Sequence, residues 1–540
     1  MALVPPLRIG ILTANVADLS PWELRLFDSI CADARFELVA VLTGAFDEPA
    51  KAAQASWLCQ RIFDFDAARF SQTIPVTALA FEKALAKSKV WLLAPTRATV
   101  AGTVSAETIA GIKDLALDVV LIHGFDDFGT ALGPHIRFGA WSLRHAGQRL
   151  QTWAAEHALA FLDPGPLVRV DLVVEAGDSV SARILSTAAF NTERTPATTL
   201  ARTADKAVSL IVRSLVRLAA DRTLAFDHLL ADPAPQPPPA PRNDAKRYAL
   251  AMARTTADRI KNGVSRRSGW LQNRWSLHFG EAPFDPAQLS RTDECVPAKG
   301  EFWADPFLVE KNGDTFVFFE NYVYAAGRGK ISVGLFRNGQ FHVLADALDC
   351  PYHLSFPLVF EHGGEMFMMP ETCGAARVEI WRAVEFPFRW ERHGVALEGL
   401  SVADPVLFND GGRWWLFANI SNTPFEDHCN ELHVFEADGP ALTRVKPHPL
   451  NPVVIGADTA RNAGRIVRRD GRLLRLSQNN THGVYGYGLN VMEITELSPS
   501  RYSESLITRI APDFKPGLIG CHHMDQTDSL YVVDACRRFG

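Results

Sequence analysis

The chain lacks the features that define several classes of protein. No run of 18 apolar residues occurs among its 540 residues, so no transmembrane helix is expected. The first twelve residues lack the charged start, long apolar core and small-residue cleavage site of a signal peptide. The net charge is −6, unlike the strongly basic balance of nucleic-acid-binding proteins. We therefore expect a globular protein with no nucleic-acid partner.

Motifs that bind metals or dinucleotides, and paired cysteines, are also missing from the sequence. The eight cysteines are scattered and contain no CxxC pair, which argues against a zinc ribbon and against a disulfide framework. A reducing, cytoplasmic location is the corresponding expectation. No GxGxxG follows the first predicted strand, and no HxH or HExxH occurs. The sequence therefore predicts neither a dinucleotide cofactor nor a metal.

A proline-rich segment divides the chain. Residues 231–241 read ADPAPQPPPAP, which cannot form a helix interior or a central strand because proline lacks the N–H and fixes φ. We expect three parts: an α/β domain over 1–225, a linker with a basic helix over 226–270, and an all-β domain over 271–540. The basic stretch 244–275 is predicted to be a solvated linking helix, with peripheral contact to an anionic membrane glycolipid as the alternative.

The first region alternates short apolar runs with helical patterns. Ser20 and Pro21 are typical of the N-cap and first position of a helix. This rhythm predicts a Rossmann-like α/β fold with a parallel sheet and helices on its faces. The expected strands and helices are 8–13, 21–34, 37–42, 118–123, 168–174 and 198–220.

The second region contains an internal repeat. Four segments align on Gly313, Gly364, Gly412 and Gly471, each reading as strand, tight turn and strand, and a looser fifth copy covers 519–536. Repeats of roughly 40–50 residues that each supply four strands indicate a β-propeller, here with five blades. We expect residues 275–280 to supply an outer strand to the last blade, because that strand would close the ring and remove an exposed edge.

The repeat also aligns polar residues. Seven residues after each turn glycine, an apolar strand ends in a polar residue, and two Ala-Asp-Pro triplets precede the glycines. The polar residues are Glu320, Glu371, Asn419 and Gln478, with Asp534 in the fifth copy, and the triplets hold Asp305 and Asp404. Equivalent positions of successive blades converge on one axis, and a buried carboxylate needs a partner or a function. We expect Asp305, Glu371 and Asp404 to share a site, although an Asp in such a turn can also simply cap its loop.

Further candidates lie at comparable blade edges, where they could bind substrate. They are His353, Arg461, Asn462, His522 and His523, together with Glu320 and Gln478 from the strand ends. Arginine near carboxylates keeps them ionised or binds an anionic substrate group. Four aromatic residues could stack on sugars or belong to the core: Trp303, Tyr322, Tyr352 and Trp414.

The ordered motifs of the second region resemble a known domain. The motifs are FWADPF (302–307), FFEN (318–321), YHLSFP (352–357), MPET (369–372), NPV (451–453), ARNAG (460–464) and LSQN (476–479). They resemble the propeller found beside the transferase domain of glucosamine inositolphosphorylceramide transferases, which is similar in design to five-bladed arabinanases, xylosidases and invertases. The resemblance implies that Asp305 is the base or nucleophile, Asp404 the orienting acid and Glu371 the proton donor, with Glu320 in the equivalent position one blade earlier.

The first region resembles the formyltransferase N-terminal fold. DVVLIHGF (118–125) followed by RFGAWSLRHAG (137–147) matches a strand and a Gly-x-x-Asn-x-His motif. Ser142 stands where that family has its catalytic Asn, Arg144 stands in place of the His, and His145 is one position off. Asp171 falls within a predicted strand. Arginine cannot act as a general base at neutral pH, so this domain is expected to keep the fold without the reaction.

The sequence predicts a carbohydrate-active protein of glycan or polysaccharide metabolism. Its propeller would cleave or transfer a glycosidic bond with Asp and Glu carboxylates, as a glycoside hydrolase or in association with a glycosyltransferase, on a carbohydrate or nucleotide-sugar substrate. Two alternatives stay open. One is a non-catalytic glycan-binding scaffold, and the other is formyl transfer to a sugar amine by the first domain.

Overall fold

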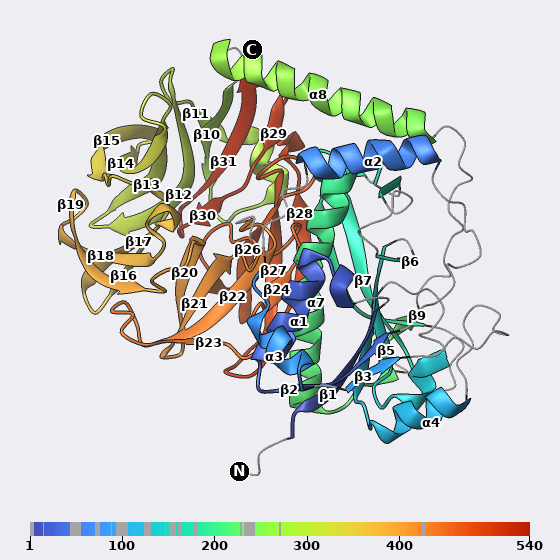
Figure 1. Ribbon diagram of the computed structural model, residues 1–540. Coiled ribbons are helices and arrows are strands. Elements are labelled where there is room, and N and C mark those ends of the chain that lie inside the picture. Colours follow the sequence, from blue (N-terminus) through green and yellow to red (C-terminus); the bar gives the residue numbers. More distant parts are fainter. Residues whose placement is uncertain are drawn as a thin grey trace. The chain divides into compact units, whose positions relative to one another are not determined.

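The fold was examined in a computed structural model (Figure 1). It describes residues 5–13, 16–43, 56–70, 76–87, 89–92, 106–123, 131–145, 147–150, 158–159, 161–162, 165–176, 182–226, 229–231, 244–268, 272–423 and 427–539. The chain forms two compact units, Met1–Asp258 and Arg259–Gly540. Most of the predicted proline-rich linker, 232–243, lies outside the described residues.

The N-terminal unit contains a mixed sheet with strand order β3-β2-β1-β4-β5-β7-β8-β9, and β6 pairs with β5. The strands β1 to β5 are parallel, and β7 to β9 continue the sheet antiparallel. The strands are β1 (Leu7–Leu12), β2 (Phe36–Thr43), β3 (Lys89–Leu92), β4 (Val119–Ile122), β5 (Ala140–His145), β6 (Gln148–Arg149), β7 (Leu167–Glu175), β8 (Arg183–Asn191) and β9 (Leu230–Ala231). The predicted α/β class and its parallel strands are confirmed.

The helices of this unit begin where local chemistry favours them. Helix α1 starts directly after Ser20, whose backbone N–H donates to Oε2 of Glu23 at 2.8 Å. Asp66 of α2 is fully buried and accepts hydrogen bonds from Thr195 and Tyr248, which ties α2, α7 and α8 together. The helices are α1 (Pro21–Ala32), α2 (Trp57–Phe70), α3 (Leu79–Leu85), α4 (Ala106–Asp114), α7 (Pro196–Asp221) and α8 (Asp244–Ser268). No helix within the described ranges has the length and apolarity to cross a membrane.

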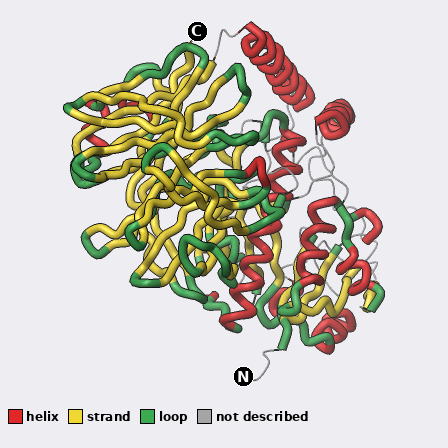
Figure 2. The backbone as a smooth tube through the Cα atoms, turned by 90° about the vertical axis from the view of Figure 1, so that its left-hand side faces the viewer, coloured by secondary structure: helices red, strands yellow, loops and turns green. Residues whose placement is uncertain are grey.

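The C-terminal unit is built almost entirely from strands, as Figure 2 shows. Five antiparallel sheets form five blades, so the predicted five-bladed propeller is confirmed. The first blade contains β12 (Glu301–Lys311), β13 (Asp314–Val323), β14 (Arg328–Arg337) and β15 (Gln340–Leu348), and the second contains β16 (Ser355–His362), β17 (Glu365–Glu371), β18 (Val378–Glu385) and β19 (Arg389–Ala396). The third contains β20 (Val402–Asp410), β21 (Arg413–Ile420), β22 (Glu431–Ala437), β23 (Val445–Pro447) and β24 (Val454–Ile455). The fourth contains β25 (Val467–Arg469), β26 (Arg472–Asn479), β27 (Gly488–Leu497) and β28 (Tyr502–Ile510).

The fifth blade joins two distant segments of the chain. Its strands are β29 (Leu518–Gly520), β30 (Met524–Gln526), β31 (Leu530–Phe539), β10 (Gln272–Glu281) and β11 (Asp293–Cys295). Strand β10 pairs with β31 along its whole length, from Gln272 opposite Phe539 to Glu281 opposite Leu530 (Figure 1). The predicted ring closure is therefore confirmed with one correction: β10 is not the outer strand, because β11 pairs with its other edge.

A repeated distortion marks the inner strands of three blades. Asp305, Phe356 and Asp404 have φ values of 50°, 46° and 44°, and each precedes a proline. The pairing register shifts at each of them, as in a β-bulge. A non-glycine residue in this left-handed region costs roughly 1–3 kcal/mol and persists only where its surroundings fix it. A bulge of this kind changes the direction of the side chain at the distorted position.

All eight cysteines are free, four of them buried.

Candidate functional site

The polar residues at the strand ends lie beside the bulges. Glu320 is opposite Ala304, Glu371 is opposite Ser355, and Asn419 is opposite Ala403, so each is paired with the residue before a bulge. All three side chains are buried. The spacing in the sequence thus corresponds to one repeated place in the fold, at the same end of successive blades.

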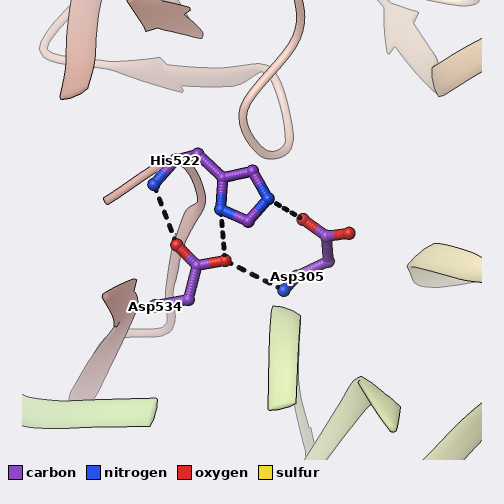
Figure 3. A group of neighbouring side chains, drawn as sticks. All are labelled: Asp305, His522 and Asp534. Atoms are coloured by element: carbon purple, nitrogen blue, oxygen red, sulfur yellow. Dashed lines mark hydrogen bonds and ion pairs between the residues drawn. The ribbon is translucent and has the colours of Figure 1, made fainter. Parts of the chain in front are cut away.

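Asp305 belongs to a group formed with the fifth blade (Figure 3). Its backbone N–H donates to Oδ2 of Asp534 at 3.1 Å, and Nε2 of His522 lies 3.5 Å from its Oδ1. Nδ1 of His522 lies 2.7 Å from Oδ2 of Asp534. Burial would lower the pKa of His522, but Asp534 and Asp305 raise that pKa to about 9. His522 is therefore an imidazolium at neutral pH and balances one of the two carboxylates.

These three residues also have the spacing of a metal site. One donor atom from each lies within 4.8 Å of the others. The three side chains also pair with one another, since Nδ1 of His522 lies 2.7 Å from Oδ2 of Asp534.

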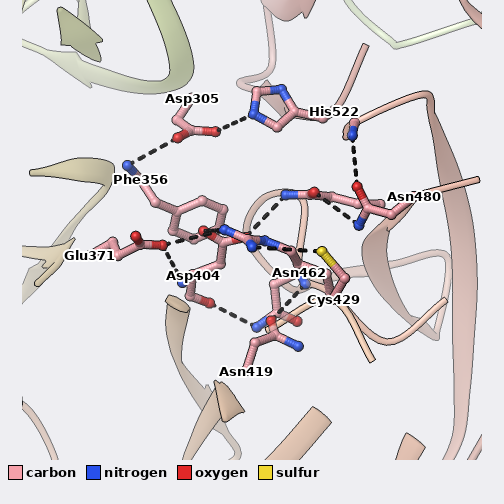
Figure 4. Close-up of polar contacts among 12 residues, drawn as sticks. Asp305, Phe356, Glu371, Asp404, Asn419, Cys429, Asn462, Asn480 and His522 are labelled. Carbon is pink, nitrogen blue, oxygen red and sulfur yellow. Dashed lines mark hydrogen bonds and ion pairs between the residues drawn. The ribbon is translucent and has the colours of Figure 1, made fainter. Parts of the chain in front are cut away.

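Glu371 and Asp404 share one guanidinium (Figure 4). Nε of Arg461 donates to Oδ2 of Asp404 at 2.7 Å, and its Nη2 lies 3.6 Å from Oε2 of Glu371. That same Oε2 accepts the backbone N–H of Asp404 at 3.0 Å. The side-chain amide of Gln478 donates to Oδ2 of Asp404 at 3.0 Å. Burial raises the pKa of Asp404 to about 7 although Arg461 opposes that shift.

Asp305 is joined to the same centre. Its Oδ2 accepts the backbone N–H of Phe356 at 3.3 Å (Figure 4). Burial raises the pKa of Asp305 to about 7; His522 opposes the shift and Asp404 adds to it. The three residues predicted to share a site therefore converge, although their catalytic roles stay a prediction.

Glu320 stands apart from this network. Its Oε1 lies 3.5 Å from Nε2 of His353, and within the described part of the chain it accepts no hydrogen bond. Burial raises its pKa well above the ordinary value, and Asp305 and Glu371 add to that rise. His353 keeps about a third of its side chain exposed, so this edge of the cluster faces solvent.

Partly exposed aromatic rings lie next to His353. Phe302 stacks on Tyr322 with centroids 4.7 Å apart, and Tyr324 packs against both. Tyr322 is 6.0 Å from His353. We call Phe302, Tyr322 and Tyr324 the aromatic platform. Flat, half-exposed rings of this kind suit the apolar face of a sugar.

The other aromatic candidates are placed differently. Trp303 packs on Phe319 and Phe341 in the first blade. The hydroxyl of Tyr352 donates to Glu379. Trp414 lies at the start of β21, whereas Asn419 near its other end adjoins the site. Of the four, only Tyr322 borders the carboxylate cluster.

Two residues predicted to bind substrate instead make contacts within the propeller. Asn462 donates its side-chain amide to the carbonyl of Asp404 and its backbone N–H to Asn419, which bridges two blades. His523 is fully buried with its ring against Phe307 and Phe356, and burial lowers its pKa to about 3. These contacts fix the bulges; neither side chain reaches the carboxyl groups.

The sequence reasoning missed several neighbours of the site. Tyr485 lies over the guanidinium of Arg461 at 5.0 Å and is about half exposed. The thiol of Cys373 donates to Oε1 of Glu371, and Asn480 donates to Gln478. Asp534 was recognised as part of the repeat but not as a site residue. Its position in the repeat carried the signal, whereas the other three lie outside the repeat.

The family model that matches this chain lies within the C-terminal unit. The family model for the N-terminal region of glucosamine inositolphosphorylceramide transferase 1 matches residues 287–515. The curated transferase of that name from Arabidopsis thaliana is 34% identical over 241 residues, covering 43% of this chain and 31% of the plant protein. Its counterpart from Oryza sativa subsp. japonica is 30% identical over 244 residues, covering 43% and 32%. The chain thus spans about a third of the length of the curated relatives it matches.

Solved glycosidase structures match this chain at low sequence identity and low TM-score. A family 117 glycoside hydrolase from Zobellia galactanivorans is 9% identical, with a TM-score of 0.33, and covers 50% of this chain and 91% of that enzyme. The α-L-arabinanase of Cellvibrio cellulosa is 13% identical, with a TM-score of 0.31, and covers 44% and 90%.

Proposed function

We propose that the C-terminal propeller is a carbohydrate-active enzyme that cleaves or transfers a glycosidic bond. The observation that carries this proposal is the buried cluster at one end of the axis. Five carboxyl groups lie there with Arg461 and His522 as the cations of the network: Asp305, Glu320, Glu371, Asp404 and Asp534. Glycosidic chemistry needs one protonated carboxyl and one ionised carboxylate close together, and such crowding supplies both states.

Asp305 is the group best suited to act on the anomeric centre. Its side chain meets Phe356 N–H and His522, and its raised pKa of about 7 keeps it able to exchange a proton near neutral pH. Asp404, held by Arg461 and Gln478, orients the site. The sequence resemblance assigns the proton donor to Glu371.

The plant relatives favour transfer over hydrolysis. Their name pairs glucosamine with inositolphosphorylceramide, so we propose a sugar donor and a glycolipid acceptor for this chain as well. The N-terminal unit offers a surface for a lipid: Trp57, Leu58 and Phe65 of α2 and Leu250 of α8 are 49–75% exposed. The sequence of α8 carries seven basic and two acidic residues, which complements an anionic lipid surface.

We further propose that the N-terminal unit keeps a formyltransferase-type fold without formyl transfer. Arg144 is paired with Glu175 on β7, and His145 uses Nδ1 to contact the carbonyl of Arg169 while its ring stacks on Phe161. Asp171 accepts from Arg169 and Thr187. Arg144, His145 and Asp171 are thus engaged in contacts within the unit. A cytoplasmic location stays our expectation.

A panel of aryl glycosides and nucleotide sugars tests the enzyme proposal. We expect hydrolysis or transfer of at least one sugar by the wild-type chain and none by Asp305→Asn. A non-catalytic glycan-binding protein would bind the sugars and turn over none, and in that case the enzyme proposal is wrong. Formyl transfer from a folate donor to an amino sugar would support the N-terminal unit as the catalytic one.

A further inference from the structure

The two glutamates at equivalent strand ends have very different contacts. Oε2 of Glu371 accepts the N–H of Asp404 and faces Arg461, while its Oε1 accepts the thiol of Cys373. Glu320 accepts no hydrogen bond from the described residues and has only the long contact to His353. Resting on the proposed glycosidic function, we infer that Glu320 is the proton donor to the leaving oxygen and that Glu371 positions Asp404.

Glu371 is poorly placed to meet a leaving oxygen. Both of its carboxyl oxygens already face donors of the protein: the N–H of Asp404, Arg461 and the thiol of Cys373. Its bond to the N–H of Asp404 also holds the residue with φ of 44°. A carboxylate in this position fixes the bulge of the next blade, which is a positioning role.

Glu320 has no cation beside it among the described residues. The N–H of Gly329 donates to Nδ1 of His353 at 2.8 Å, so the proton of the neutral ring resides on Nε2. Burial lowers the pKa of His353, which keeps that ring neutral. Glu320 thus has a neutral neighbour, whereas Asp305 and Asp404 have His522 and Arg461. Of these three carboxyls, Glu320 is the one that no cation holds ionised.

The aromatic platform supplies the binding surface that a leaving group needs. The ring centroid of Tyr322 lies 6.0 Å from that of His353, whose Nε2 faces Glu320. A sugar or other leaving group stacked on Phe302, Tyr322 and Tyr324 would place its bridging oxygen toward Glu320. The leaving group would therefore bind on the first-blade side of the site.

The proton transfer balances with the proposed role of Asp305. The bond from the anomeric carbon to the leaving oxygen breaks, and its electron pair stays on that oxygen, which takes the proton of Glu320. The anomeric carbon forms a bond either to the Asp305 carboxylate or to the oxygen of a water or acceptor hydroxyl whose proton Asp305 accepts. No oxidant, reductant or further reactant is needed.

Matched substitutions at the two glutamates test the inference with two readouts. The first is the carboxylic-acid C=O band in the infrared spectrum at pH 8, where Asp305 and Asp404 are mostly ionised. We expect Glu320→Gln to remove that band and Glu371→Gln to keep it. This readout needs no substrate.

The second readout is turnover of paired glycosides. Glu320→Gln is expected to slow substrates with alkyl leaving groups by about 10²–10⁴-fold, because those oxygens need a proton. Nitrophenyl glycosides, whose leaving group needs none, should stay within about tenfold of the wild-type rate. Glu320→Asp, which keeps an ionisable group, should restore part of the alkyl rate, and thermal melting of each variant checks its folding.

The outcomes separate the two proposals. A band that survives Glu320→Gln and disappears in Glu371→Gln, or an equal loss of alkyl and nitrophenyl turnover in Glu320→Gln, would overturn the role of Glu320. No turnover of any glycoside by the wild-type chain, with the band still assigned to Glu320, would overturn the glycosidic function instead.

Discussion

Both units bury charged side chains, but they balance them differently. In the N-terminal unit, Glu175 lies between Arg144 and Arg149, and Asp205 pairs with Arg25. In the propeller, five carboxyl groups converge where Arg461 and His522 are the balancing cations. Burial without full compensation raises the pKa of Asp305 and Asp404 to about 7.

On the proposed function, this difference separates charged pairs that stabilise the fold from carboxyl groups that serve a reaction. A buried pair holds two strands together, and removing one partner leaves the other uncompensated. Crowded carboxyls lower stability at neutral pH and are retained where a reaction needs their shifted proton affinities. The propeller itself offers an internal contrast: Asp525 is bidentate with Arg465, which also donates to Leu308 O.

The largest expected effect is on turnover. Asp305→Asn removes the charge that a base or nucleophile carries while keeping the shape, so we expect at least about a 10³-fold loss of kcat with sugar binding retained. A purely loop-capping Asp305 would instead cost about 1 kcal/mol of stability with activity unchanged. Steady-state kinetics, glycan titration and melting of one variant decide among these outcomes. Asp525→Asn is the matched control and is expected to act on stability rather than on chemistry.

The next effect contrasts the two units in stability. Glu175→Gln should lower the free energy of unfolding by about 3 kcal/mol, because it leaves Arg144 and Arg149 buried with no carboxylate between them. Asp305→Asn should cost less at pH 8, since it relieves repulsion among carboxyls. Urea unfolding at pH 8 measures both. Equal losses would remove the distinction between paired and crowded charge.

The pH dependence of stability follows from the raised pKa values. The pKa of Asp305 is about 7 in the folded chain and about 4 when unfolded, so the folded chain binds more protons between these pH values and stability falls as pH rises. His522, with a pKa of about 9 when folded against about 6.5 unfolded, continues the fall up to about pH 9. Buried neutral histidines such as His523 act in the opposite direction, so the comparison is made between wild type and Asp305→Asn. From pH 5 to pH 8 we expect the stability of the wild type to fall by about 2 kcal/mol relative to that of Asp305→Asn, and an unchanged difference would contradict the raised pKa of Asp305.

The smallest effect concerns the exposed apolar side chains of α2. Replacing Trp57 and Phe65 together by Ser should weaken binding to vesicles containing an anionic phosphoinositide about tenfold, because each ring loses buried apolar area. Sedimentation with vesicles measures the change. Val343→Ser and Leu344→Ser, exposed on β15 of the propeller, form the control pair. Equal effects of both pairs, or no vesicle binding by the wild type, would remove the lipid proposal.

The architecture of the propeller could be predicted from the sequence because the turn glycines and strand patterns of each blade are local and repeated. The turn glycines at 313, 364, 412 and 471 all have positive φ, as tight hairpins require. The equal spacing of Glu320, Glu371 and Asn419 from those glycines translated directly into equivalent places in the fold. Strand β10 was found for a different reason: an open blade leaves an exposed edge. Its place inside the blade was missed because β11 is a three-residue strand with no periodic signal.

The contacts within the site were less predictable. Glu320 and Glu371 occupy identical sequence positions, yet a cysteine two residues later and an arginine 90 residues away engage only Glu371. Tyr485 belongs to a glycine-rich loop with no counterpart in the repeat, so the repeat spacing could not predict its contact with Arg461. Such differences arise from which blades are neighbours in the ring, and only the three-dimensional arrangement determines them.

The closure of the ring has a consequence for how the protein is made. Strand β10 finds its partner β31 about 250 residues further along the chain, so the ribosome synthesises four blades before β10 can pair. Trp275, Leu277 and Phe279 stay without their buried surroundings during that time, which exposes an aggregation-prone strand. Strand β31, which is synthesised last, carries Asp534. The carboxylate of Asp534 accepts the backbone N–H groups of His522 and Asp305. Folding of the nascent chain and assembly of the carboxylate cluster therefore finish in a single event, and an incomplete propeller would carry no working centre.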